Sequence, residues 1–187
     1  MMIEQKVAES RTKRGKVMKI NGPVDAFAVF IATGFGAGLI PLAPGTFGSV
    51  VGLALAYGLI ATLKDEILLL QNALLLASLF FTWIGIWAGT RAETVFESKD
   101  ASQIVIDEVA GQLIAFTLIA PFMPQMGGNL KWALIAGFAL FRLFDIFKPF
   151  PINRLQVLTG GVGVMMDDVI AGVYAAVGLS LLLWAFI

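Results

Sequence analysis

The chain has 187 residues, of which 58% are hydrophobic and only 14% charged, and its formal net charge is zero. Globular domains usually carry about 25% charged residues, so this composition argues against an ordinary soluble domain and excludes an intrinsically disordered chain. The absence of cysteine and histidine excludes disulfide bonds, thiol and histidine nucleophiles and the usual zinc ligands. Any metal site must therefore use oxygen ligands.

Residues 1–22 form a basic segment with six lysine or arginine and two acidic side chains. This polar stretch is too long for the start of a signal peptide. We interpret it as a basic cytoplasmic N-terminal arm, which either lies against anionic lipid headgroups or only fixes the topology. Residues 23–187 are expected to form a single membrane-embedded domain.

The next segment, 24–46, is apolar but contains several helix-breaking residues: Gly34, Gly36, Gly38, Pro41, Pro44 and Gly45. Unpaired backbone groups at membrane depth are costly unless they are buried in protein or line a wet cavity. We therefore expect 24–40 to be a re-entrant or interfacial helix. The loop 41–46 would then return the chain to the same side of the membrane.

The remaining chain contains long uncharged stretches, at 67–90, 109–130 and 169–187, in addition to 26–63. A helix needs about 20 apolar residues to cross a bilayer. We predict spans at 47–63, 67–90, 103–122, 131–147 and 168–187. The expected fold class is thus all-α, an integral membrane bundle of about five transmembrane helices plus the re-entrant or interfacial N-terminal helix.

The basic residues orient this bundle. If the N-terminus is cytoplasmic and 24–46 turns back, the segments 91–102 and 148–167 also face the cytoplasm and carry most of the loop lysines and arginines. Only Lys64 and Lys131 then fall near the outer face. The distribution predicts a multi-pass membrane protein with these two segments inside.

Five carboxylates lie in or beside the apolar spans: Asp107, Glu108, Asp145, Asp167 and Asp168. Acids inside a membrane are costly and usually functional, and the predicted topology carries all five to one cytoplasmic layer on three helices. Together with Arg142 and Lys148 they would leave a net charge of −3, which needs counter-ions or raised pKa values. Carboxylate oxygens favour Mg²⁺ or Mn²⁺, and Mg²⁺ commonly shares its coordination with substrate phosphate oxygens.

Arg142, Asp145 and Lys148 follow one another at intervals of three residues and would share a broad face at the end of a helix. Arginine offers a two-pronged contact to phosphate, and lysine a point charge. Pro149 disfavours helix at Lys148 and would release it from the helix end. The alternative is an ion-pair ladder that serves packing alone, but it would leave the other four acids uncompensated.

Two glycine-containing segments are candidates for contact with an anion. Pro44–Gly48 leads into a predicted helix, whose N-terminal amides favour phosphate, and Thr46 could cap that helix or contact a ligand oxygen. Gly160–Gly163 would allow a close backbone approach before Asp167. Both segments could instead be tight turns between packed spans.

Two of the acids lie in the same short sequence pattern. The sequences 107–111 and 168–172 both read Asp-x-x-Ala-Gly. Each places small residues one turn after an acid, where they would let two helices approach closely.

Four blocks of the sequence, 34–48, 106–111, 141–152 and 160–172, resemble in content and order the bacterial phosphatidylglycerophosphatase A family. The resemblance implies a Mg²⁺-dependent phosphatase of the bacterial inner (plasma) membrane, which converts phosphatidylglycerophosphate to phosphatidylglycerol and inorganic phosphate. The acidic and basic motif positions of the family correspond to Asp107, Glu108, Arg142, Asp145, Lys148, Asp167 and Asp168.

The resulting hypothesis is metal-assisted hydrolysis of a phosphomonoester on a phospholipid substrate at the cytoplasmic face. The expected metal ligands are Asp107, Glu108, Asp167 and Asp168. The expected catalytic residues are Asp107, Glu108, Asp145 and Asp168, and the expected phosphate contacts are Arg142, Lys148, Gly45 and Thr46. Attack by activated water and a phosphoaspartyl intermediate both stay open. An ion-coupled transporter is the alternative function, and no nucleic-acid partner is expected.

Overall fold

A computed structural model describes residues 19–99, 101–150, 152 and 160–186. Every regular element within these residues is helical, as predicted. The main helices are α2 (Pro23–Ala32), α3 (Pro44–Leu63), α4 (Ile67–Val95), α5 (Ile106–Ile114), α7 (Leu130–Phe147) and α9 (Gly161–Phe186), and the short α6 (Met123–Met126) lies among 3₁₀ turns. Most of the predicted basic arm, residues 1–18, lies outside the described residues.

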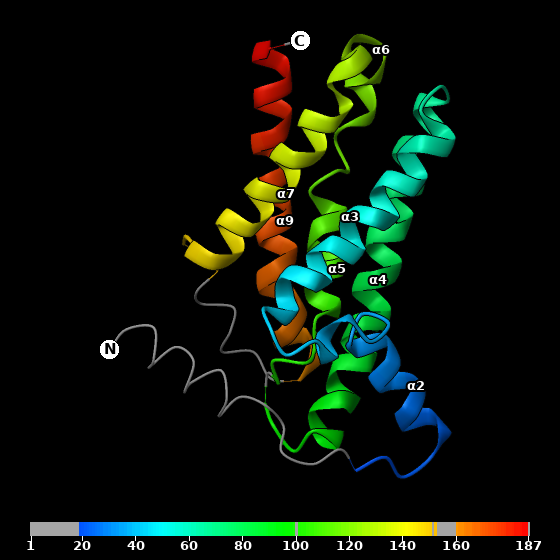
Figure 1. The fold of residues 1–187 in the computed structure, drawn as a ribbon, viewed down its shortest axis with the longest axis vertical. Helices are drawn as coiled ribbons and strands as arrows, with labels where there is room; N and C mark the ends of the chain where they lie inside the picture. Colours follow the sequence, from blue (N-terminus) through cyan, green and yellow to red (C-terminus); the bar gives the residue numbers. More distant parts are fainter. Residues whose placement is uncertain (1–18, 100, 151, 153–159, 187) are drawn as a thin grey trace.

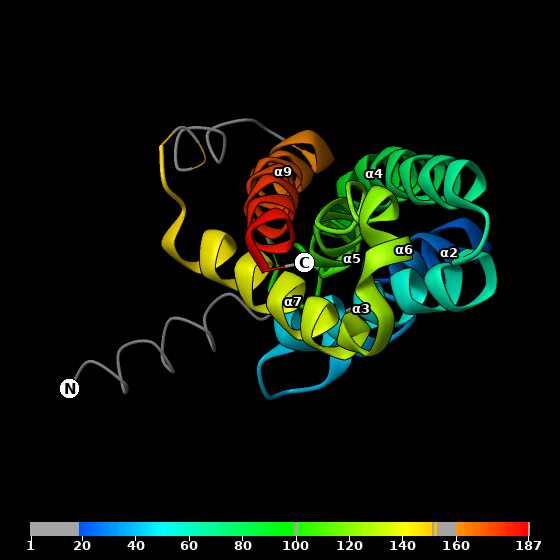
Figure 2. The ribbon, with the colours of Figure 1, turned by 90° about the horizontal axis from the view of Figure 1, so that it is seen from above.

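The short helix α5 forms the centre of the bundle. It packs against α3, α4 and α9, and the view down the bundle shows it enclosed by longer helices (Figure 2). On the outside, α7 packs on α9, and α2 packs on one end of α4 (Figure 1). The residues of α5 that face these neighbours, Ile106, Val109, Ala110 and Leu113, are completely buried.

Three helices, α3, α4 and α9, are long and apolar enough to cross a membrane. Their outward faces carry large apolar side chains, among them Tyr57 on α3, Leu68 and Trp83 on α4, and Leu181 and Trp184 on α9, each at least half exposed. A surface of this kind needs an apolar surrounding. The fold is therefore a helical membrane bundle, in which α7 is also apolar but carries Lys131, Arg142 and Asp145.

The segment predicted as a re-entrant or interfacial helix is α-helical only as far as Ala32, and a short 3₁₀ helix follows at Ala37–Leu39. The helix ends there because Gly34, Phe35 and Gly36 all take positive φ angles, of 56°, 61° and 94°. Ten helical residues span about 15 Å, half of the roughly 30 Å hydrocarbon layer. The helix α2 is thus too short to cross the membrane, in agreement with the prediction.

The next helix begins earlier than predicted, because Pro44, Gly45 and Thr46 form the first turn of α3 rather than a loop. Proline suits this position, since the first amides of a helix have no partner within it. The N-cap is Ala43, in a left-handed conformation (φ 49°) and without a side-chain cap. The suggestion that Thr46 caps this helix is therefore wrong.

The third predicted span, 103–122, is not one continuous helix. The helix α5 ends at Ile114, and the amides of Phe116 and Thr117 then bond to carbonyls only three residues back, at Leu113 and Ile114. Pro121, which has no amide hydrogen, follows inside the 3₁₀ turn Ala120–Phe122. The Gln71 side chain of α4 donates a hydrogen bond to the Thr117 carbonyl, so irregular backbone inside the bundle finds a partner.

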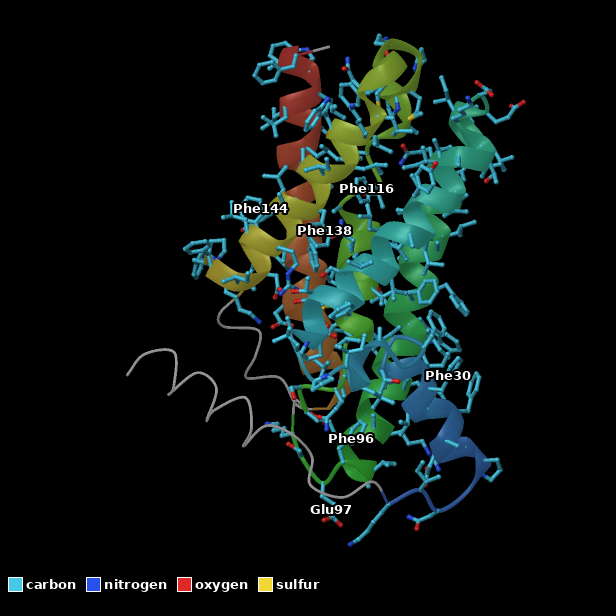
Figure 3. All side chains as sticks on the ribbon, viewed as in Figure 1. Phe30, Phe96, Glu97, Phe116, Phe138 and Phe144 are labelled. Carbon is cyan, nitrogen blue, oxygen red and sulfur yellow. The ribbon has the colours of Figure 1, made fainter. Side chains whose placement is uncertain are left out.

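The ring of Phe116 fills the space beside this break. It is completely buried and lies between α5 and α7 (Figure 3). Gly137 of α7 makes room for it, since a Cβ atom there would come within 2.4 Å of the ring. The break in the third predicted span is therefore held in place by close packing.

The segment 160–163 leads directly into a helix rather than forming a loop, because α9 begins at Gly161, and none of its residues lines the cavity that contains Asp167 and Asp168. The close approach expected there does occur, but the neighbour is α4. A Cβ atom on Gly161 would lie 1.9 Å from the carbonyl oxygen of Ile86, and the Gly161 amide donates a 2.8 Å hydrogen bond to the Thr90 hydroxyl. These glycines therefore hold α9 against α4.

The two Asp-x-x-Ala-Gly sequences meet where α5 crosses α9. A Cβ atom on Gly111 would lie 2.7 Å from the Asp168 carbonyl oxygen, and one on Gly172 would lie 2.5 Å from the Gly111 carbonyl oxygen. Only glycine permits this approach. The crossing carries Asp107 and Asp168, each one turn before its glycine, to the same region of the bundle.

Candidate active site

A cavity of about 300 Å³ lies where the first turn of α3, the start of α5, the end of α7 and the start of α9 meet. Its polar lining contains all nine residues predicted for the site: Gly45, Thr46, Asp107, Glu108, Arg142, Asp145, Lys148, Asp167 and Asp168. Residues separated by more than 120 positions in the sequence therefore share one small space. The prediction that the acids of three helices gather in one layer is confirmed.

Two of the five acids are paired with the two basic residues. Arg142 Nη1 lies 2.7 Å from Asp145 Oδ2, and the ammonium group of Lys148 contacts Asp167 Oδ2. The α7 helix ends at Phe147, and Lys148 takes a left-handed conformation with φ 43°, as expected for a lysine released before Pro149. This turn directs the lysine toward α9, although it follows Asp145 by only three residues.

The environment keeps Lys148 charged. Burial alone would lower the pKa of its ammonium group, but contact with Asp167 and the nearby carboxylates of Asp168 and Asp145 more than offset this effect. The pKa of Lys148 consequently lies above its usual value. The second cation, Arg142, also contacts α3, because its Nη1 donates a 3.2 Å hydrogen bond to the Ser49 hydroxyl.

The other three acids, Asp107, Glu108 and Asp168, form a compact group. Each offers a carboxylate oxygen within 4.8 Å of those of the other two. Each also has a buried oxygen without a hydrogen-bond partner among the described residues: Asp107 Oδ1, Glu108 Oε2 and Asp168 Oδ2. Three clustered carboxylates with unsatisfied buried oxygens fit a hard divalent cation. Asp167, the fourth predicted metal ligand, is held by Lys148 beside this group.

The first turn of α3 lies directly against Glu108. A Cβ atom on Gly45 would come within 2.1 Å of Glu108 Oε1 and 3.5 Å of Arg142 Nη1. Glycine is therefore required for the helix to approach the carboxylate. The amide of Gly45 lies at a position that helical hydrogen bonding leaves unpaired, so this end of α3 faces the cavity with its positive dipole.

Two polar residues at or beside the cavity, Ser49 and Ser102, were not predicted. Ser49 is completely buried and links Arg142 to α3, since its hydroxyl donates a 3.0 Å hydrogen bond to the Gly45 carbonyl. Ser102 lines the cavity from the segment before α5. The only sequence signal for Ser49 was its own polar side chain, one helical turn after Gly45.

Comparisons with known proteins give a consistent result. A model of the family described as Phosphatidylglycerophosphatase A matches residues 30–183. The chain is 38% identical to Phosphatidylglycerophosphatase A of Haemophilus influenzae over 149 residues, which cover 79% of this chain and 83% of that protein. Over 147 residues it is 35% identical to the Escherichia coli protein of the same name, covering 78% and 77% of the two chains.

A third relative carries a different name. The chain is 39% identical over 156 residues, 83% of this chain and 93% of the relative, to a Bacteroides thetaiotaomicron protein named "Putative phosphatidylinositol-3-phosphatase". Both names describe the removal of a phosphate from a phospholipid. No solved structure significantly matches the chain.

Proposed function

The chain belongs to the phosphatidylglycerophosphatase A family, and from this premise we propose that it hydrolyses phosphatidylglycerophosphate to phosphatidylglycerol and inorganic phosphate. The coarser activity follows from the family itself: the protein is a phosphatase of phospholipid metabolism. The family membership also decides against the ion-coupled transporter considered from the sequence. The proposal concerns the substrate, the metal, the roles of the site residues and the side of the membrane.

One observation carries the proposal. Two acids of the cavity are paired with Arg142 and Lys148, and three further carboxylates have oxygens within 4.8 Å of one another. Mutual repulsion would make this arrangement unfavourable without a cation. The same cavity contains both basic side chains and the N-terminus of α3. A cavity that can hold a cation on its carboxylates, beside groups that can bind an anion, suits a phosphate monoester.

We assign the phosphate to the basic side of the cavity. Among the described residues, Arg142 uses Nη1 for Asp145 and Ser49, and its second amino group, Nη2, would donate to a phosphate oxygen. Lys148 would supply the second positive charge. Thr46 and the amide of Gly45, at the first turn of α3, would orient the group through hydrogen bonds.

Asp107, Glu108 and Asp168 would hold Mg²⁺, with Asp167 beside them. Carboxylate oxygens are hard ligands, and one oxygen of each of the first three has no hydrogen-bond partner among the described residues. When bound, the cation would offset the negative charge that develops on phosphate oxygens and promote the ionisation of water. Asp145 or Glu108 would accept the proton of the attacking water.

Covalent catalysis by an aspartate is the competing mechanism. In that case a carboxylate oxygen attacks phosphorus, the alcohol of phosphatidylglycerol leaves with a proton, and water later cleaves the acyl phosphate. Acid quenching during turnover of ³²P-labelled substrate distinguishes the two routes. Label that stays on the protein supports the covalent route, and unlabelled protein supports direct attack by water.

The substrate and the metal are tested together with purified protein in mixed micelles. We expect phosphate release from phosphatidylglycerophosphate, its loss with EDTA, and its return with added Mg²⁺. Phosphatidylinositol 3-phosphate, suggested by the name of one relative, is the comparison substrate. No release from the first lipid in the presence of Mg²⁺, or faster release from the second, would contradict the proposed substrate.

The cytoplasmic side is proposed from the basic residues. Arg91 lies in the last turns of α4, and Lys99 and Lys148 follow α4 and α7 at the cavity end, whereas Lys64 follows α3 at the opposite end (Figure 1). This bias fits the positive-inside rule. Because the chain has no cysteine, Ser98→Cys and Asp65→Cys give clean single labels. An impermeant maleimide should label Asp65→Cys in intact cells and Ser98→Cys only in inverted vesicles, and the reverse pattern would overturn the assignment.

A further inference from the structure

A second hollow lies away from the cavity, between α2 and the outward face of α4. Its volume is about 1500 Å³, larger than the roughly 300–1,000 Å³ of a pocket for a drug-sized molecule. None of its lining residues takes part in the cavity described above. We call it the α2–α4 groove.

One end of the groove is aromatic. Phe27, Trp83 and Trp87 line it, and the rings of Phe27 and Trp87 are 6.1 Å apart between centroids. Phe27 is 54% exposed and Trp83 is 68% exposed. Because α4 is long and apolar enough to cross a membrane, this end of the groove opens toward the hydrocarbon layer.

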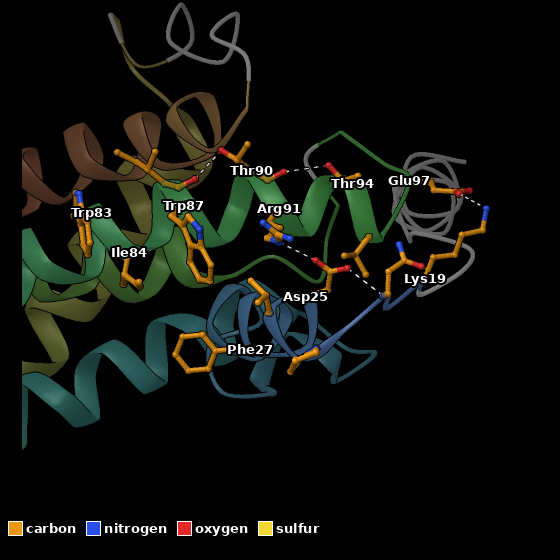
Figure 4. A pocket seen from close by; sticks show the side chains of 15 residues that line it. Lys19, Asp25, Phe27, Trp83, Ile84, Trp87, Thr90, Arg91, Thr94 and Glu97 are labelled. Carbon is orange, nitrogen blue, oxygen red and sulfur yellow. Dashed lines mark hydrogen bonds and ion pairs between the residues drawn. The ribbon is translucent and has the colours of Figure 1, made fainter.

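The other end is charged. Arg91 Nε lies 2.8 Å from Asp25 Oδ1, and Lys19 Nζ lies 2.6 Å from Glu97 Oε1. Figure 4 shows these pairs following the aromatic rings along the groove. The four side chains carry no net charge. The hydrogen bond of Arg91 to Asp25 uses Nε, and no hydrogen bond joins its two outer amino groups to the described residues.

The order of residues on α4 matches the depth profile of a bilayer leaflet. Trp83, Trp87 and Arg91 are four residues apart and therefore share one face of the helix. Tryptophan prefers the boundary between hydrocarbon and headgroups, and the charged pairs come directly after it. A molecule that fills the groove must therefore be apolar at one end and polar at the other.

We propose that the α2–α4 groove binds a zwitterionic phospholipid with a primary amine headgroup, such as phosphatidylethanolamine. Its acyl chain would lie against Trp83 and Trp87, and its phosphate would accept hydrogen bonds from the outer amino groups of Arg91. The ammonium group would donate to the carboxylate of Glu97, which is 53% exposed.

The neutral charge balance selects this class of lipid. An anionic headgroup would find no excess positive charge, because both cations have carboxylate partners. A quaternary ammonium group, as in phosphatidylcholine, has no N–H to donate. The proposal does not depend on the phosphatase chemistry, since none of the residues that it uses lines the active-site cavity.

The test is native mass spectrometry of the purified, delipidated full chain titrated with one lipid at a time. We expect phosphatidylethanolamine to give one retained adduct, with an apparent Kd about tenfold lower than those of phosphatidylglycerol and phosphatidylcholine, as for the gain of one charged hydrogen bond. Trp83→Ala and Arg91→Gln should each weaken this adduct about tenfold. Trp184→Ala, which removes a still more exposed tryptophan from α9, should leave it unchanged.

Several outcomes would overturn the proposal. They are equal retention of phosphatidylglycerol, equal retention of phosphatidylcholine, and equal weakening by Trp184→Ala. Arg91→Gln also breaks the pair with Asp25 and could loosen α2, so Trp83→Ala serves as the second variant. Its side chain is mostly exposed, and we expect its phosphatase activity and melting temperature in detergent to match those of the unmodified protein. Unchanged lipid retention in folded Trp83→Ala would also reject the site.

Discussion

The active-site cavity and the α2–α4 groove both contain two ion pairs, but they use them differently. In the groove, the two charges within each of the pairs Arg91–Asp25 and Lys19–Glu97 cancel. Each pair has at least one exposed side chain. In the cavity the pairs Arg142–Asp145 and Lys148–Asp167 are more deeply buried, and three further carboxylates lie beside them.

This difference in charge balance indicates which of the two sites is the candidate reaction site. Exposed and balanced pairs contribute little to stability and persist without a ligand. A buried excess of negative charge is costly, and a fold retains it only where a ligand compensates it. The excess of three carboxylates, and not the number of ion pairs, therefore distinguishes the cavity from the groove.

Removing one of the excess charges should produce the largest effect. In Asp168→Asn we expect the phosphatase rate to fall by at least about 1000-fold, because one metal ligand is lost. The melting temperature should not fall, since the change also reduces repulsion among the three acids. Asp107→Asn should behave in the same way. Rates and thermal unfolding are measured on the same detergent preparation.

The matched control for this prediction comes from the groove. Glu97→Gln also removes one carboxylate, but from a balanced and exposed pair, and its phosphatase rate should stay within a factor of about two. A normal rate in both Asp168→Asn and Asp107→Asn would show that the carboxylate cluster is not the reaction site.

Crowding of Glu108 by the α3 helix should produce the next largest effect. A methyl group in Gly45→Ala would overlap the Glu108 carboxylate, and displacement of a reacting group by about 1 Å can reduce the rate about 100-fold. Gly58→Ala is the control on the same helix, because its methyl group would meet no atom within 4 Å. Equal rates in the two variants would mean that the position of Glu108 is unimportant for turnover.

The sequence predicted the members of the cavity well because buried charge is rare in apolar helices. Asp107, Asp145 and Asp168 are conspicuous because most of their neighbours in the sequence are uncharged. The repeated Asp-x-x-Ala-Gly pattern indicated the helix crossing that brings two of them together. The Lys148–Pro149 pair also indicated the end of α7. These signals are local, and each has one dominant physical cause.

The features that the sequence did not reveal depend on contacts between distant segments. The end of α5 at Ile114 depends on a hydrogen bond from Gln71, and the helical state of Gly161–Gly163 depends on close contact with α4. The pairing of Lys148 with Asp167, which separates this acid from the other three, likewise depends on how α7 packs on α9. Uniform hydrophobicity gives no periodic signal for such contacts.

The crossing that supports the cavity allows a test of stability with a smaller expected effect. In Gly172→Ala the added methyl group would lie 2.5 Å from the Gly111 carbonyl oxygen, and the helices must separate at a cost of about 1–3 kcal/mol. In Gly178→Ala on the same helix, the nearest atoms lie at 3.6 Å, an ordinary contact. Thermal unfolding should show a lower melting temperature only for Gly172→Ala, and equal stability of both variants would argue against the tight crossing.

The smallest effect is expected from the groove, as a dependence of stability on pH. Hydrogen bonds from Arg91 and from the Asn21 amide hold the pKa of Asp25 below its ordinary value of 3.8. A carboxyl group with a lowered pKa in the folded state stabilises the protein above the ordinary pKa, and this contribution disappears as the pH falls through the lowered value. The difference in melting temperature between the unmodified protein and Asp25→Asn should therefore be constant near neutral pH and shrink below about pH 4. A difference that persists unchanged at lower pH would mean that the Asp25 charge does not hold α2 against α4, and that packing of Phe27 on Trp87 does so instead.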